Sequence, residues 1–121
     1  MAAGKKVFIV EDNPVISEIL TEKVRRMGYS VCGPARSGEE AIESCRTFCP
    51  DLVIMDITLE GDMDGIEAGM QIKKQFNIPF VFVSAYSESE VPGRMKEAEP
   101  AGYIVKPFSD NDLRSVLSSL L

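Results

Sequence analysis

Short apolar runs that end in polar side chains are the feature that most limits the fold of this chain. Amphipathic stretches of roughly ten to fifteen residues separate the runs, a pattern typical of alternating strands and helices in a parallel sheet. The runs and the residues that close them are 7–10 with Glu11 and Asp12, 52–55 with Asp56, 80–83 with Ser84, and 103–105 with Lys106. Because the carboxyl ends of parallel strands meet at one edge of the sheet, we expect these polar groups to share that edge.

The length and composition favour a single domain. The chain has 121 residues, of which 45% are hydrophobic, so we expect residues 1–121 to form one domain. A formal net charge of -6 argues against direct contact with nucleic acid or an anionic membrane. No apolar stretch approaches the roughly 20 residues of a membrane span, and no signal-peptide core follows residues 1–6. We therefore expect a cytoplasmic protein.

Cap residues and periodicity predict five helices between the strands. The expected caps are Asn13, Ser37, Ser87 and Ser109, and the third helix is expected over residues 65–76. Ser37 with Glu40, and Ser87 with Glu90, have capping-box spacing. The residues expected to face the core from the first helix are Ile16, Ile19, Leu20, Val24 and Met27.

Cys32, Cys45 and Cys49 do not form a metal-binding or disulfide pattern. The chain has no histidine and no second cysteine pair that would complete a zinc site, so we interpret the three thiols as reduced core residues. The lack of histidine also excludes a phosphohistidine on this chain. Any phosphoryl donor must therefore be another molecule.

Glu11, Asp12 and Asp56 would bring up to three negative charges close together at the sheet edge. Any one of them alone would more often be an exposed loop residue. As a set, they indicate either a raised pKa or a bound cation, and we favour the cation. Oxygen ligands without His or Cys select a hard ion, and a site with few carboxylates suits Mg²⁺.

Lys106 is the residue that points to phosphoryl chemistry. An ammonium beside the acids can form a mere surface ion pair, but with Mg²⁺ and the Ser84 hydroxyl it would form a clamp for phosphoryl oxygens. Asp56 would then be the nucleophile that becomes an aspartyl phosphate. The bond to Pro107 is also a place where a cis peptide can direct the amine into the crevice.

Five motifs in order resemble the receiver domain of two-component response regulators, the CheY-like family. They are Glu11-Asp12, Asp56 after the central strand, Asp64-Gly65 before the third helix, Ser84-Ala85, and Lys106-Pro107-Phe108. The resemblance extends from residue 6 to the C-terminus. It implies an α/β, flavodoxin-like, doubly wound sheet of five parallel strands in the order 2-1-3-4-5, with five helices.

The same resemblance implies roles for residues around the phosphoacceptor Asp56. Asp12 would bind Mg²⁺ directly, Glu11 through water, and Thr58 through its backbone carbonyl. The roles implied for the remaining residues are switch hydroxyl for Ser84, phosphate-binding lysine for Lys106, and switch aromatic for Tyr103.

The resemblance further implies a signalling switch, not an enzyme with a separate substrate. A sensor histidine kinase or phosphotransfer protein would donate the phosphoryl group, and the chain would catalyse only its own phosphorylation and autodephosphorylation. Ser84 would then move toward the phosphoryl group and Tyr103 would turn inward, changing the face of the fourth helix, fifth strand and last helix. We expect Met95 and Tyr103 on this face, which would meet a downstream protein, a linked output domain or a second copy of the chain.

Two features depart from the usual family pattern. The loop from Asp56 to Gly65 is one residue longer and has Glu60 where a proline is common, which bears on the contacts of Thr58. Tyr86 stands two residues after Ser84, beside the path that the resemblance assigns to the hydrolytic water. An aromatic ring there predicts a slowly decaying phosphorylated state.

Three other functions fit these residues less well. A flavin-binding electron carrier needs a phosphate loop after the first strand, where Glu11 and Asp12 would repel phosphate. A phosphatase of the haloacid dehalogenase type expects a second acid where Thr58 stands. An unphosphorylated pseudo-receiver that acts as a protein-interaction module keeps the fold, but the full set of site residues disfavours it.

Overall fold

A five-stranded parallel sheet forms the centre of the molecule. Its strand order, β2-β1-β3-β4-β5, confirms the α/β, flavodoxin-like fold expected from the sequence. The strands are β1 (Lys6–Val10), β2 (Ser30–Ala35), β3 (Leu52–Asp56), β4 (Phe80–Ser84) and β5 (Gly102–Val105). The computed structural model describes residues 4–86 and 92–121.

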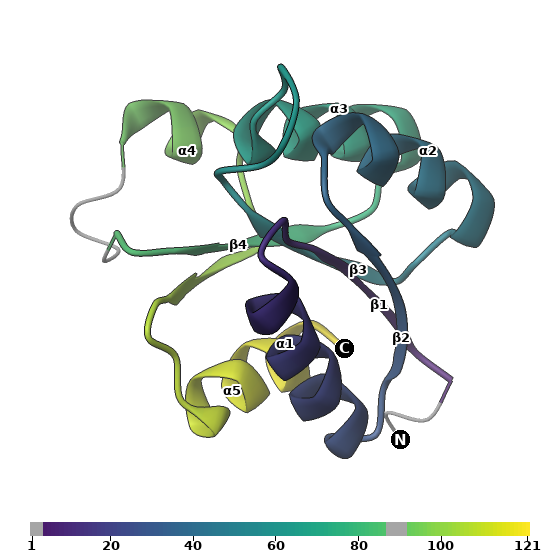
Figure 1. The fold of residues 1–121 in the computed structure, drawn as a ribbon, viewed down its shortest axis with the longest axis vertical. Coiled ribbons are helices and arrows are strands. Elements are labelled where there is room, and N and C mark those ends of the chain that lie inside the picture. The colour runs from purple at the N-terminus through teal and green to yellow at the C-terminus, as the bar shows by residue number, and fades with distance from the viewer. Residues whose placement is uncertain (1–3, 87–91) are drawn as a thin grey trace.

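Helices cover both faces of the sheet (Figure 1). They are α1 (Pro14–Arg26), α2 (Gly38–Phe48), α3 (Gly65–Phe76), α4 (Gly93–Glu97) and α5 (Asp110–Leu120). α1 and α5 lie on one face, and α2, α3 and α4 lie on the other. Within the described part of the chain, none of these helices has the length and apolar character needed to span a bilayer.

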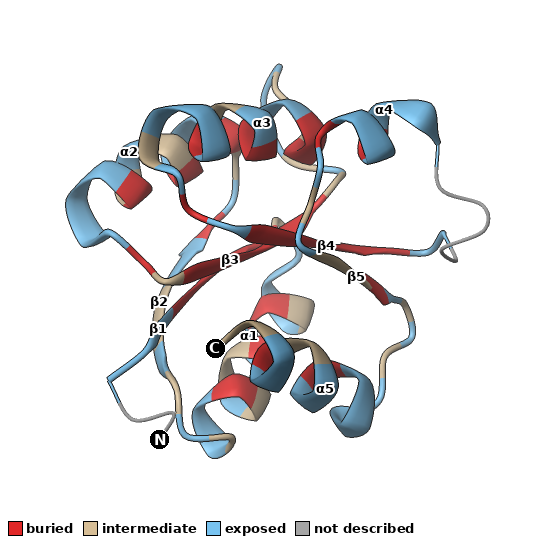
Figure 2. Cartoon of the chain, turned by 180° about the vertical axis from the view of Figure 1, so that it is seen from behind, coloured by how far each residue is buried: buried red, intermediate tan, exposed pale blue. Residues whose placement is uncertain are grey.

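The core consists of two apolar clusters, one on each side of the sheet. Figure 2 shows buried residues along the strands and on the sides of the helices that face them. β3 and β4 are buried over their whole length, as expected for central strands that are covered on both faces. This burial fixes the strand ends that carry the polar residues.

Helix starts largely follow the expected caps. The side chain of Asn13 accepts hydrogen bonds from the N–H groups of Val15 and Ile16 at the start of α1. Ser109 forms a complete capping box with Asp112 at the start of α5. Local sequence therefore sets where both helices begin.

The expected capping box at Ser37 is only half formed. The Ser37 hydroxyl accepts a hydrogen bond from the Glu40 N–H, but the Glu40 carboxylate accepts one from the Arg36 N–H and not from that of Ser37. The prediction of the reciprocal hydrogen bond was therefore wrong: its donor is the N–H of Arg36, one residue before the expected Ser37. The expected capping box at Ser87 lies outside the described residues, and α4 begins at Gly93.

Three apolar side chains are placed differently from their expected positions. Ile19 was expected in the core but is 46% exposed, because Leu20 occupies the sheet-facing side of α1. Met95 was expected on a partner-binding face but is fully buried, because α4 packs it into the apolar cluster that contains Phe80 and Phe82. Cys49 was expected in the core but is exposed, since it caps α2 in a left-handed conformation (φ 47°).

Candidate functional site

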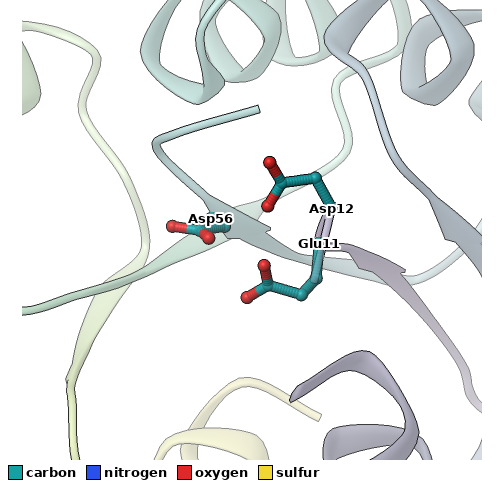
Figure 3. A group of neighbouring side chains, drawn as sticks. All are labelled: Glu11, Asp12 and Asp56. Atoms are coloured by element: carbon teal, nitrogen blue, oxygen red, sulfur yellow. The ribbon is translucent and has the colours of Figure 1, made fainter. Parts of the chain in front are cut away.

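Three carboxylates from adjacent strand ends meet at the carboxyl edge of the sheet. Glu11 and Asp12 follow β1, and Asp56 is the last residue of β3, which pairs with β1. One carboxylate oxygen from each residue lies within 4.8 Å of the corresponding oxygens of the other two. Figure 3 shows the three side chains converging on one space beside the end of β3. The structure thus brings together the acids that the sequence predicted at this edge.

Glu11 is the most deeply buried of these acids, with only 2% of its surface exposed. Burial raises the pKa of the Glu11 carboxyl from 4.5 to about 7, and the hydrogen bond to Asp56 and the negative charge of Asp56 act in the same direction. The Asn13 N–H and the Lys106 ammonium oppose this rise in pKa. The largest cause is burial, so the raised pKa shows mainly that the ionised form of Glu11 is poorly solvated at this site.

Lys106 reaches the acids from the end of β5. Its N–H donates to the Ser84 carbonyl at 2.7 Å, which holds the ends of β4 and β5 together. Its Nζ lies 3.3 Å from Asp56 Oδ2 and 3.4 Å from Glu11 Oε1. The peptide bond between Lys106 and Pro107 is cis. The amine expected in the crevice therefore contacts two of the three acids.

Ser84 and Tyr103 lie on the neighbouring strands. Ser84 is buried, and its hydroxyl accepts a hydrogen bond from the Tyr86 N–H at 3.3 Å. Tyr103 is half-buried, with its ring centroid 6.4 Å from that of Phe82. The roles that the family resemblance implied for Ser84 and Tyr103 remain predictions.

The loop after β3 is held close to the site by backbone contacts. The Ile57 N–H donates to Asp56 Oδ1 at 2.7 Å, and the Gly65 N–H donates to the Ile57 carbonyl at 2.7 Å. A Cβ on Gly65 would lie 1.9 Å from the Asp56 carbonyl oxygen, so only glycine fits this approach. Thr58 follows Ile57 directly and is exposed.

Two arginines that the sequence did not single out contact this loop. Arg36 pairs with Glu60 at 3.0 Å, and Arg94 of α4 pairs with Asp64 at 2.9 Å. Both pairs join residues that are far apart in the sequence, so no periodicity or short motif could have indicated them.

The donor set at the acids suits a hard divalent cation. One ammonium, that of Lys106, contacts two of the three carboxylates, and burial together with the neighbouring Asp56 raises the pKa of the Glu11 carboxyl. Carboxylate oxygens without His or Cys are the ligands that Mg²⁺ prefers. The arrangement of Glu11, Asp12 and Asp56 is therefore better explained as a candidate magnesium site than as a cluster of acids with no ligand.

Comparison with known proteins gives consistent matches over nearly the whole chain. The family model for the response regulator receiver domain matches residues 7–118. The chemotaxis protein CheY of Thermotoga maritima is 33% identical over 118 residues, which cover 97% of this chain and 98% of that protein. The transcriptional regulatory protein PdtaR of Mycobacterium tuberculosis is 38% identical over 112 residues, which cover 93% of this chain but 54% of that protein. This chain thus spans about half the length of PdtaR.

A solved structure with a similar fold is described with a bound metal ion. It is the receiver domain of the sensor histidine kinase PA1611 from Pseudomonas aeruginosa PAO1, described with a magnesium ion coordinated in the active site cleft. Its TM-score is 0.86 at 28% identity, and the match covers 98% of each chain.

Proposed function

This chain belongs to the response regulator receiver domain family, and from that premise we propose that it is a phosphorylation-controlled signalling switch whose phosphoacceptor is Asp56. The observation that carries the proposal is the convergence of the acids and Lys106 on Asp56 at the edge of a buried sheet. Residues 1–121 would form the receiver unit. We propose the cytoplasm as its compartment.

In the proposed transfer, a sensor histidine kinase or a phosphotransfer protein supplies the phosphoryl group, since this chain has no histidine. A carboxylate oxygen of Asp56 attacks the phosphorus. The P–O bond forms as the P–N bond of the donor breaks, and the donor imidazole leaves with the electron pair. The Lys106 ammonium, 3.3 Å from Asp56 Oδ2, would bind a phosphoryl oxygen and stabilise its charge.

The acids would hold the metal that this chemistry requires. Asp12, Asp56 and the Thr58 carbonyl would bind Mg²⁺ directly, and Glu11 would bind it through water. When bound, the ion would supply positive charge to the phosphoryl oxygens. The chain itself positions the nucleophile: the Ile57 N–H donates to Asp56 Oδ1, leaving Oδ2 beside Lys106.

Phosphorylation would act on the rest of the molecule through Ser84. Its hydroxyl now accepts from the Tyr86 N–H, and after phosphorylation it would turn to donate to a phosphoryl oxygen. Tyr103 on the adjacent strand would then turn further inward and change the face of α4, β5 and α5. That face would bind a downstream protein, a linked output domain or a second copy of the chain. The chain would catalyse only its own phosphorylation and dephosphorylation.

Intact mass after incubation with Mg²⁺ and a small acyl phosphate tests this function. We expect the parent protein to gain the mass of one phosphoryl group and Asp56→Asn to gain none. The asparagine keeps the shape of the side chain but removes the nucleophile. A parent protein that gains no mass would contradict the proposal and favour a pseudo-receiver that acts only by binding partners.

A further inference from the structure

The long loop between β3 and α3 is fastened to the segment that joins β2 to α2. The Glu60 N–H donates to the Arg36 carbonyl at 3.1 Å, and Glu60 forms an isolated parallel bridge with Ser37. Arg36 Nη2 also lies 3.0 Å from Glu60 Oε1. Backbone and side chain of Glu60 thus contact the same neighbour. This is the position at which the usual receiver pattern has a proline.

The contact with Arg36 fixes Glu60, which is the C-terminal end of the short backbone span from Ile57 to Glu60. The N-terminal end of this span is Ile57, whose N–H donates to Asp56 Oδ1 and whose carbonyl accepts from the Gly65 N–H. Only Thr58 and Leu59 lie between Ile57 and Glu60. The backbone around Thr58 therefore has little freedom as long as Glu60 stays in place.

The partner of Glu60 is itself held by a helix. The Arg36 N–H donates to the Glu40 carboxylate at 3.1 Å, and the Ser37 hydroxyl accepts from the Glu40 N–H as the cap of α2. Through Arg36 and Ser37, the loop is thereby attached to α2, a helix outside the acidic site. Positions set by helices are more exact than those set by loops alone.

We propose that Arg36 and Glu60 are positioning residues of the magnesium site, which fix the loop so that the Thr58 carbonyl can bind the ion. The inference rests on the proposed function, because it presumes that Mg²⁺ binds at Asp56. Neither residue contacts the acids in the structure, so both act through the loop backbone. The ion pair takes over the task that a proline ring performs by stiffening the chain.

Positioning and simple electrostatics predict opposite results for Arg36. Removing a positive charge near a cation site strengthens cation binding if charge alone matters. Removing Arg36 weakens binding if it acts by holding the loop. Glu60→Ala weakens binding in both cases, so Arg36→Ala is the decisive variant.

The experiment measures Mg²⁺ affinity by following backbone amide NMR shifts of the 121-residue chain during titration with MgCl₂. The variants are Arg36→Ala, Glu60→Ala and the charge exchange that combines Arg36→Glu with Glu60→Arg. The matched control is Arg26→Ala, which breaks another exposed ion pair, 2.7 Å from Glu22, on the distant helix α1. Thermal unfolding without metal is recorded for every variant.

We expect both alanine variants to weaken Mg²⁺ binding by about two- to fivefold, the range that the loss of an exposed ion pair allows. The charge exchange should recover most of this loss, and Arg26→Ala should stay within the error of the parent. The metal-free Tm should change no more than it does in Arg26→Ala, because both pairs are largely exposed. A tighter or unchanged affinity in Arg36→Ala would overturn the inference. A parent chain that does not bind Mg²⁺ would instead refute the proposed function.

Discussion

The buried carboxyl of Glu11 should make the metal-free protein less stable as the pH rises. Its pKa is raised from 4.5 to about 7 in the folded state, so the folded chain holds this proton more tightly than the unfolded chain. The stability linked to the proton is fully present below the unfolded pKa and is lost as the pH rises through the folded pKa. At 1.36 kcal/mol per pKa unit, the loss is on the order of 3 kcal/mol by pH 8.

The perturbation that isolates this contribution is Glu11→Gln, because glutamine keeps the shape of the side chain and cannot ionise. Urea unfolding in EDTA at pH values from 5 to 8 gives the free energy of unfolding of parent and variant. The parent minus the variant should fall by about 2 to 3 kcal/mol across this range. Titrating groups distant from Glu11 contribute equally to both proteins and cancel in the difference, whereas those in contact with it, Asp56 and Lys106, belong to the measured effect.

Magnesium should offset this loss of stability more strongly in the parent than in Glu11→Gln. A cation that binds the ionised acids stabilises the folded state by mass action, so MgCl₂ at pH 8 should raise the parent's free energy of unfolding more than that of Glu11→Gln. Glu22→Gln on the surface of α1 serves as the control and should follow the parent throughout. A parent-minus-variant difference that is flat or rises with pH would refute the argument that Glu11 is a buried, undercompensated acid.

Other changes near the site have equally direct outcomes. Gly65→Ala places a Cβ 1.9 Å from the Asp56 carbonyl oxygen and should lower the free energy of unfolding by about 1–3 kcal/mol in urea titrations. Tyr86→Ala should shorten the half-life of the phosphorylated protein, measured by intact mass over time; an unchanged or longer half-life would contradict shielding by the ring. Arg94→Ala breaks the exposed pair with Asp64 and should change global stability little, yet speed amide hydrogen exchange in α4; equal exchange in both proteins would show that the pair does not restrain α4.

The fold and the acidic cluster could be predicted because their determinants are local in the sequence. An apolar run closed by Asp56 indicates both a buried strand and the carboxylate at its end. Once the strands are parallel, geometry alone brings Glu11 and Lys106 to the same edge. No long-range contact had to be known for this step.

The errors concern burial, which depends on neighbours that the sequence does not name. Ile19 keeps helical spacing with Leu20 and Val24, yet only Leu20 and Val24 are buried, and Ile19 is exposed. Met95 belongs to a helix of mostly polar residues, and its complete burial depends on how α4 meets the core. The periodicity of apolar residues predicts which side of a helix faces the core, but not how many residues on that side are buried.

The loop contacts escaped prediction for a different reason. Arg36 and Glu60 lie 24 positions apart in two irregular segments, and exposed charged residues usually have no structural partner. The added length of the loop was visible in the sequence, whereas the neighbour that holds it required the structure.

The β3–α3 loop is braced from two sides, and the two braces have different consequences. Arg36 holds it from the segment before α2, away from the proposed output face, whereas Arg94 holds it from α4, which forms part of that face. Asp64, the partner of Arg94, caps α3 immediately before Gly65, whose backbone packs on Asp56. If phosphorylation of Asp56 shifts α4, linkage requires that a partner bound to α4 shift the phosphorylation equilibrium by the same factor. We propose that such a partner would reach the loop through the Arg94 pair, while the Arg36 pair would keep the backbone of the proposed metal site in place during the change.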